Sequence, residues 1–210
     1  VLLIVIAGDR GFAGGFNSNV LKKAQSRYDK LKEKGNAIIM PIGRKASEYF
    51  GGNGYEILMA YEHVSEHLSI YKAFEISSKI IDAFKSNKID KVELVFTNYI
   101  SQLVQHTRHM CILPIEPIDE SKIVKNQTTY EPSAEAVFDS IIPQYITGIL
   151  YGAIIDSFTA EQASRRIAME NASDNATEMI DNLSLIYNRA RQTSITQEIT
   201  EIVGGSNAKS

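Results

Sequence analysis

The sequence predicts a doubly wound, mostly parallel α/β layer followed by one long C-terminal helix. From residue 1 to about residue 116, short β-rich runs alternate with helical patterns, which is the order that builds a parallel sheet. From about residue 143 to residue 203 no β-rich run follows, and good helix formers continue almost without a break. We therefore expect an α/β domain over 1–116, a connecting loop over 117–133 and a long helix over 134–210.

The first part of the domain is predicted from three strand patterns and two helical patterns. The apolar run VLLIVIA is typical of a strand buried on both faces, and NAIIMPI predicts the second strand. A weaker strand is expected near YEILMAY. Between the first two strands, NSNVLKKAQSRYDKLKEKG predicts a helix with Asn17 or Ser18 as N-cap and Gly35 just past its end. A short helix near RKASEYF is closed by Gly51 and Gly52.

The second part of the domain is predicted to be a helix followed by a β-hairpin. The segment LSIYKAFEISSKIIDAFKSN has a helical period, and its apolar face consists of Ile70, Phe74, Ile76, Ile80, Ile81 and Phe84. The runs KVELVFTNYI and QLVQHTRHMCILPI are too close in sequence for a crossover helix, so we expect them to pair antiparallel. The resulting layer is Rossmann-like.

The long helix is predicted to form one half of an antiparallel coiled coil. Apolar and small residues recur along it at alternating spacings of three and four, as in the seam of a left-handed coiled coil. The positions on this count are Ile155, Phe158, Gln162, Arg165, Met169, Ala172, Ala176, Met179, Leu183, Ile186 and Ala190. Each large side chain buried in such a seam contributes about 1.5 to 3 kcal/mol, so the seam needs a partner, which is either another chain or a missing segment of this one. Because the chain begins inside a strand without an initiator Met, we expect a preceding segment to be absent.

Composition excludes several classes of protein. The net charge of −3 provides no field for nucleic acid or an anionic membrane. The single cysteine, Cys111, excludes an intramolecular disulfide and a cysteine-based zinc site. VLLIVIA is too short to span a bilayer and has no basic residues before it, so we expect neither a transmembrane helix nor a signal peptide.

The loop IAGDRGFAGGFNSN is the segment most like a ligand site. A glycine loop between a strand and a helix often holds phosphate. Its spacing, Gly8-x-x-Gly11-x-x-Gly14-Gly15, matches neither the dinucleotide fingerprint nor the P-loop, and no Lys-Ser or Lys-Thr follows. We therefore expect these glycines to make tight turns and to bind no nucleotide.

No other pattern predicts a catalytic or metal site. His63 and His67 are spaced i, i+4 but lack the adjacent glutamate of a zinc motif. His106 and His109 are three apart in a predicted strand and so face opposite sides. We expect no catalytic residue, cofactor or metal.

One segment resembles a known family closely. Residues 160–205, AEQASRRIAMENASDNATEMIDNLSLIYNRARQTSITQEITEIVGG, are similar to the C-terminal signature of the γ subunit of F-type ATP synthases, the central shaft of that rotary machine. DRGFAGGFNSN looks like the family's first strand-loop-helix junction, and YEPSAEAVF like the segment leading into its C-terminal helix. The resemblance covers essentially the whole chain, although the family's long N-terminal helix is absent. That helix is the natural partner for the seam.

The resemblance implies a non-catalytic rotor. It implies that Arg191, Gln192 and Thr196 contact the β subunits, as does Arg165, for which an ion pair with Glu161 or Glu170 is the alternative. It also implies that Tyr130 and Glu131 form a foot on the membrane c-ring.

The partners implied by the family are the α and β subunits, the ε subunit and the c-ring. The implied location is the cytoplasmic face of a bacterial inner membrane, where the shaft couples proton translocation to ATP synthesis or hydrolysis. Two other readings remain open. A nucleotide-dependent α/β enzyme would need a catalytic constellation, and a non-rotary coiled-coil adaptor differs from the rotor only in the C-terminal motif.

Overall fold

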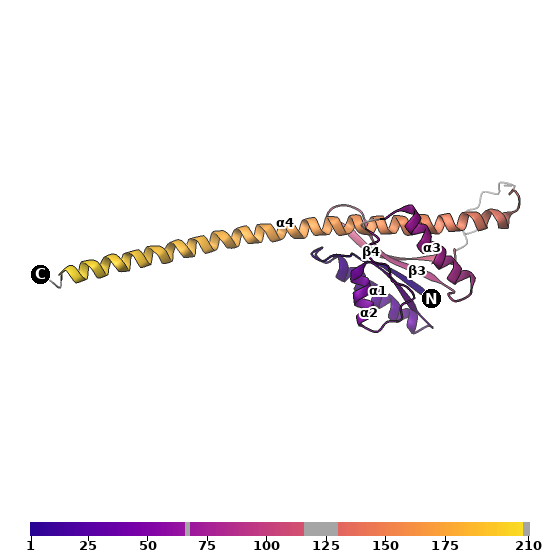
Figure 1. Ribbon diagram of the computed structural model, residues 1–210, viewed down its shortest axis with the longest axis horizontal. Coiled ribbons are helices and arrows are strands. Elements are labelled where there is room, and N and C mark those ends of the chain that lie inside the picture. Colours follow the sequence, from indigo (N-terminus) through magenta and orange to yellow (C-terminus); the bar gives the residue numbers. More distant parts are fainter. Residues whose placement is uncertain (66–67, 116–129, 208–210) are drawn as a thin grey trace. The chain divides into compact units, whose positions relative to one another are not determined.

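The computed structural model describes residues 1–65, 68–115 and 130–207 and divides into two compact units, 1–166 and 167–210. The first unit is built on a four-stranded sheet with the order β2-β1-β3-β4 (Figure 1). Its strands are β1 Leu2–Ile6, β2 Ile38–Ile42, β3 Val92–Tyr99 and β4 Gln105–Leu113. Strand β1 pairs in parallel with β2 and β3, whereas β3 and β4 form an antiparallel pair. The predicted mostly parallel sheet and its terminal hairpin are confirmed.

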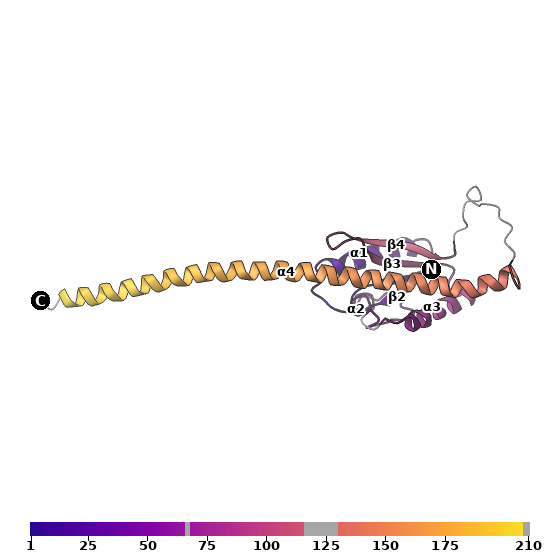
Figure 2. The same ribbon diagram turned by 90° about the horizontal axis from the view of Figure 1, so that it is seen from above.

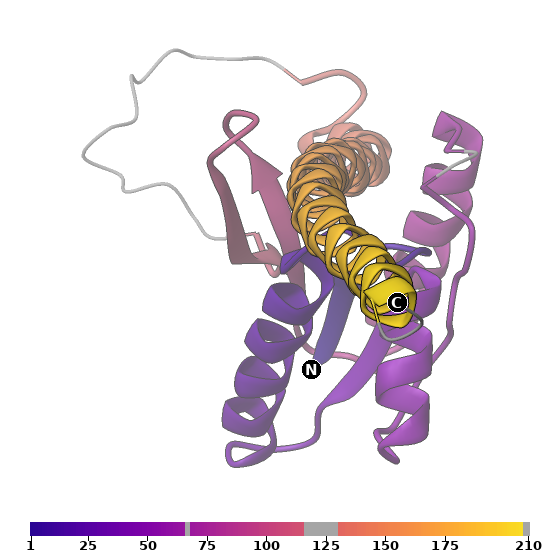
Figure 3. The same ribbon diagram turned by 90° about the vertical axis from the view of Figure 1, so that its left-hand side faces the viewer.

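Helices cover both faces of this sheet. The helices are α1 Phe16–Lys32, α2 Arg44–Gly52, α3 Ile70–Lys85 and α4 Ala134–Asn207. One core joins α1 and α2 to the face that carries Leu3 and Val5. The other core joins α3 and the first part of α4 to the face that carries Leu2 and Ile4. Figure 3 shows α1 across the sheet from α4. Because both faces of β1 are covered, all five of its residues are buried, as its continuous apolar run predicts.

The part of α4 that belongs to the first unit, 134–166, lies along the strands of that unit, as Figure 2 shows from above. Its side chains Ile146, Leu150 and Ile154 are fully buried in the core. Two buried hydrogen bonds fix the position of α4 on the core. The hydroxyls of Thr147 and Ser77 lie 2.6 Å apart. Ser157 Oγ accepts the backbone N–H of Thr97 at 3.1 Å. The periodicity of the seam does not predict which side of α4 faces the sheet, because the residues on the sheet-facing side are a mixture of apolar and small polar ones.

The helix begins at Ala134. Ser133 caps it, because Ser133 Oγ accepts the backbone N–H of Ala136 at 3.2 Å. Pro143 lies inside the helix. By length and composition alone α4 is apolar enough to cross a membrane, since one 18-residue window within 134–203 reaches a mean hydropathy of 1.2, with 28% of that window buried. Part of this apolar character belongs to the core described above.

Three local expectations were wrong. The N-cap of α1 is Gly15 rather than Asn17 or Ser18, and no side chain caps the helix. The segment near YEILMAY makes only isolated bridges, Ile39 to Ile57 and Ile42 to Tyr61, instead of a strand. On α3, Ile70 and Phe74 are about half exposed, at 50% and 51%. The buried stripe of α3 consists of Ala73, Ile76, Ser77, Ile80 and Ile81, because two small residues let the helix approach the sheet.

Candidate functional site

The glycine loop between β1 and α1 is held closed by its own side chains. The Gly8 N–H donates to Oδ1 of Asn17 at 2.9 Å, and Asn17 Nδ2 donates to the carbonyl of Arg10 at 3.1 Å. Asn17 therefore ties the loop together instead of capping the helix. The Gly8 N–H is therefore already used within the loop.

The space above Gly8 is filled by helix α4. A Cβ on Gly8 would lie 2.6 Å from both Cδ and Oε1 of Glu161. Glu161 is only 4% exposed, and it pairs with Arg165 one turn further along the helix. The Glu161 carboxylate therefore occupies the space next to Gly8.

Arg165 completes the contact between α4 and the loop. Its Nε and Nη2 donate to the carbonyl of Gly11 at 3.4 and 3.3 Å, and its Nη1 donates to Oε1 of Gln162 at 3.1 Å. Of the two ion pairs weighed for Arg165, the structure contains the one with Glu161. These contacts join the glycine loop to α4 within the first unit.

Asp9 organises the other side of the same loop. Its Oδ1 accepts the backbone N–H groups of Arg44, the first residue of α2, at 2.8 Å and of His63 at 2.9 Å. Asp9 is only 3% exposed. Its buried carboxylate therefore has hydrogen-bond donors, and it links the glycine loop to the start of α2 and to the segment around His63. Gly43 has to be glycine, because its φ is +98° and a Cβ there would lie 2.0 Å from the carbonyl oxygen of Ala7.

The seam of α4 is exposed along the described chain. Within the first unit Ile155 is 40% exposed and Phe158 is half-buried. In the second unit every described side chain from Met169 to Val203 is exposed, including the two seam alanines Ala172 and Ala176. The larger seam residues have exposed fractions of 45% for Met169, 64% for Met179, 59% for Leu183 and 62% for Ile186, and Ala190 is also exposed. An apolar stripe of this length on one helix requires a cover.

The residues of the predicted β-subunit contact lie in the second unit. Arg191, Gln192 and Thr196 are all exposed. Thr196 Oγ1 donates its proton to the carbonyl of Gln192 at 2.8 Å, so this hydroxyl is left as an acceptor toward a partner. Within the described chain, no hydrogen bond or ion pair engages the side chains of Arg191 and Gln192.

The predicted foot residues lie just before α4. Tyr130 is 43% exposed, and its ring packs against Phe138 with the ring centroids 5.9 Å apart. Glu131 is exposed. This pair therefore presents one ring and one carboxylate at the start of the helix.

The histidines do not form a site in the described chain. His63 has a positive φ of 55° and uses its backbone to bind Asp9, while His67 lies outside the described residues. His106 and His109 are exposed on β4. Within 1–65, 68–115 and 130–207, no group of three or more His, Cys, Asp or Glu side chains is arranged to hold a metal ion.

Comparison with known proteins identifies the family. A family model described as ATP synthase matches residues 1–208. The ATP synthase gamma chain of Ruminococcus albus is 53% identical over 207 residues, which cover 98% of this chain and 72% of that relative. This chain belongs to the ATP synthase γ-chain family. The gamma chain of Alkaliphilus metalliredigens is 42% identical over 211 residues, with 98% and 72% covered. The resemblance inferred from residues 160–205 is confirmed.

Chains in solved structures of ATP synthases have the same fold. A chain in the structure titled as the Euglena gracilis mitochondrial ATP synthase, with OSCP, F1 and c-ring, matches with a TM-score of 0.72 and 18% identity, covering 99% of this chain and 72% of that one. A chain of the Tetrahymena thermophila central stalk and c-ring matches with a TM-score of 0.67 and 23% identity, covering 82% and 75%. At these identities the likeness concerns the fold, and it confirms the α/β sheet with a long C-terminal helix.

Two features of this γ chain were missed from the sequence. Gly148 and Gly152 lie on the exposed side of α4, and a Cβ on either would meet no atom within 4 Å. Gly148 precedes Ile155 by seven residues, so these glycines extend the seam face by two helical turns. In the sequence, two glycines at this spacing can equally mark the start of a helix, so their place on the seam face was not recognised.

The second missed feature is a buried carboxylate on β3. Glu93 accepts Nε and Nη2 of Arg27 on its two oxygens, each at 2.6 Å, and lies 2.9 Å from Nζ of Lys91. The hydrogen bonds from Arg27, together with those from Lys91, lower the pKa of the Glu93 carboxyl from 4.5 to about 2, against the opposing effect of burial. The sequence signal that could have predicted this ion pair is the single glutamate within an otherwise apolar strand.

Proposed function

We propose that this γ chain is the non-catalytic rotor of its ATP synthase and transmits rotation between a membrane c-ring and the catalytic α and β subunits. The observation that carries the proposal is the exposed apolar stripe of α4 described above. A shaft acts by contacting the conformations of its partners unequally, since only differential contacts shift an equilibrium. Each orientation of an asymmetric helix then favours a different state of each β subunit.

The proposed partners follow from the family and from the residues at the two ends of α4. We assign the exposed second unit to the axis of an α/β hexamer, and Tyr130 with Glu131 to the c-ring. The ε subunit is a further expected partner, and nucleic acid is not. The complex would lie on the cytoplasmic face of a bacterial inner membrane, without insertion of this chain into the bilayer. Protons are the proposed coupling ion, although the gamma chain of Acetobacterium woodii, 36% identical over 224 residues, is named as sodium ion specific.

The occupant of the seam is proposed to be an N-terminal helix of the same subunit. Gly148 and Gly152 support this arrangement, because the open space around them lets a second helix come close to the backbone of α4. Ala172 and Ala176 provide the same room further along. A helix packed there would cover the larger residues on the same face.

The contact with the β subunits is assigned to Arg191, Gln192 and Thr196. An exposed arginine can hold a carboxylate in bidentate geometry, which suits a grip on an acidic loop. Arg165 is assigned to the same contact with less freedom, since its guanidinium already binds Glu161 and Gly11. We expect its contribution to be through the exposed edge of that guanidinium.

The test is reconstitution with purified α and β subunits, with and without a peptide that covers the N-terminal helix of a relative. Co-elution and ATP hydrolysis are followed together. The rotor role predicts a complex and faster hydrolysis, both weakened by Arg191→Ala with Gln192→Ala. Gln197→Ala is the matched control, because exposed Gln197 lies about 120° around the helix from position 191 and about 140° from position 192. If the chain stays apart from α and β in every mixture, the adaptor reading replaces the rotor.

A further inference from the structure

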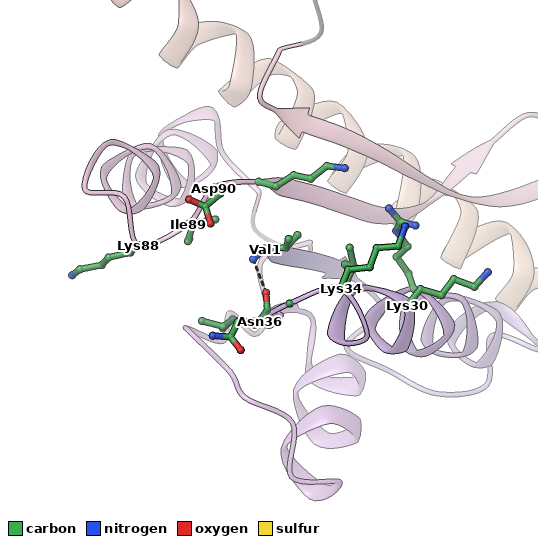
Figure 4. Close-up of a pocket in the computed structure, with 12 residues that line it drawn as sticks. Val1, Lys30, Lys34, Asn36, Lys88, Ile89 and Asp90 are labelled. Atoms are coloured by element: carbon green, nitrogen blue, oxygen red, sulfur yellow. Dashed lines mark hydrogen bonds between the residues drawn. The ribbon is translucent and has the colours of Figure 1, made fainter.

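A pocket lies at the end of the first unit opposite the glycine loop, where the parallel strands begin. It has a volume of about 550 Å³ and is enclosed by the end of α1, the loop before β2 and the loop before β3 (Figure 4). The backbone nitrogen of Val1 donates to the carbonyl of Asn36 at 2.8 Å across its floor. None of the functional contacts proposed above uses this pocket.

Its lining is strongly basic in an acidic protein. The chain has 22 basic and 25 acidic residues, yet the pocket wall carries Arg27, Lys30, Lys34, Lys88 and Lys91 against a single acidic residue, Asp90. Such a concentration of one sign in a concave site raises the local concentration of counter-ions.

Two of these cations are fixed in place from below. Buried Glu93 holds Arg27 through two hydrogen bonds and lies 2.9 Å from Lys91. The carboxylate thus orients both side chains at the pocket wall and neutralises one of their two charges. Lys91 Nζ and the remaining guanidinium nitrogen of Arg27 keep protons to donate.

The other lysines have no ion pair within the described chain. Lys30 leaves the last turn of α1 and Lys34 follows the end of that helix, both beside the pocket, whereas Lys88 points away from it (Figure 4). A basic residue at a helix C-terminus also offsets the helix dipole. Lys32 lies in the last turn of α1 but does not line the pocket. Substitution of Lys32 therefore tests the effect on the helix dipole without removing a pocket residue.

We propose that this pocket binds a phosphate group. Arg27 and Lys91 donate hydrogen bonds to the anion from fixed positions, and the exposed side chains of Lys30 and Lys34 contact its other oxygens. A compact divalent anion with several acceptor oxygens matches a fixed guanidinium together with mobile ammonium groups. The site is distinct from the glycine loop and does not depend on the rotor role. Free phosphate and the terminal phosphate of a nucleotide share this chemistry.

The test is a titration of the whole chain with inorganic phosphate at constant ionic strength, followed by the amide NMR signals of Gly35 and Asn36. We expect saturable shifts. Lys30→Gln with Lys34→Gln should raise the dissociation constant at least about tenfold, because two of the contacting charges are removed. Lys32→Gln should change it less than about twofold. All three sites are exposed, so circular dichroism should confirm an unchanged fold.

Two further arms make the outcome decisive. A parallel titration with ADP distinguishes the sources, since tighter binding of ADP at the same amides would assign the phosphate to a nucleotide. Perchlorate at equal ionic strength tests for diffuse attraction. Equal effects of perchlorate and phosphate, equal losses in the Lys32→Gln variant, or no shift at Gly35 and Asn36 would each overturn the proposal.

Discussion

The carboxylate of Glu161 fills the space above Gly8, where a Cβ would lie 2.6 Å from its Cδ. This relationship explains why a loop that looks like a phosphate cradle has a structural role. It joins two segments far apart in sequence, and Arg165 strengthens the same contact by binding the carbonyl of Gly11. The glycine is needed because it makes room for a side chain of the protein itself.

Substitution of Gly8 tests this relationship. We expect Gly8→Ala to lower the free energy of unfolding by about 1 to 3 kcal/mol, because the new methyl group displaces a buried, paired carboxylate. The measurement is urea denaturation. In a Glu161→Ala background the same Gly8→Ala change should cost much less, since the obstructing carboxylate is gone. Gly11→Ala, where a Cβ would meet nothing within 4 Å, is the control. Equal costs of Gly8→Ala in both backgrounds would contradict this account.

Asp9 provides a second test of the loop. Asp9→Ala should destabilise the chain by about 2 to 4 kcal/mol, because it leaves the N–H groups of Arg44 and His63 without their acceptor. Asp9→Asn retains an oxygen that can accept and should recover more than half of the loss. Thermal unfolding of the three proteins provides the comparison. A similar loss for Asn and Ala would show that the negative charge, rather than the acceptor, is what matters.

The Glu93 pair predicts a specific dependence of stability on pH. The pKa of Glu93 is lowered to about 2 in the folded chain, so its contribution is fully present above its unfolded pKa near 4.5 and is lost as the pH falls toward 2. The contribution is about 3 kcal/mol at neutral pH. The stability difference between the wild type and Glu93→Gln should therefore shrink steadily between pH 5.5 and pH 3. Glu48→Gln, which removes an exposed ion pair, should have almost no effect at either pH.

Substitutions at Gly148 can distinguish effects on the stability of the chain from effects on its binding to a partner helix. Gly148→Ala should stabilise the isolated chain by about 0.5 to 1 kcal/mol, because alanine favours a helix and the site is open. Gly148→Leu should leave the chain folded but weaken binding of a peptide from the N-terminal helix of a relative at least about tenfold. Fluorescence anisotropy of the labelled peptide measures this. Asn188→Leu, on the side of α4 away from the seam, is the control, and an equal loss there would refute the proposed register.

Much of the fold was predictable because local patterns reflect it directly. The continuous apolar run of β1 predicted a strand buried on both faces, and the short spacing between β3 and β4 predicted their antiparallel pairing. The failures were also local in origin. Asn17 has the chemistry of an N-cap, but its side chain is used by Gly8 and Arg10 instead. Competing hydrogen-bond partners from nearby segments decide such cases, and composition does not reveal them.

The sequence by itself determined the order of the strands and helices that form, the apolar seam of α4 and, through residues 160–205, the family, because periodicity and motifs can be recognised without any knowledge of packing. Only the tertiary structure decided what fills the glycine loop and what anchors Arg27. The contact between Arg165 and Gly11 spans 154 positions, and that between Arg27 and Glu93 spans 66. Such pairs form only when α4 and α1 dock on their faces of the sheet, and the geometry of that docking is set by the whole core rather than by the residues that meet.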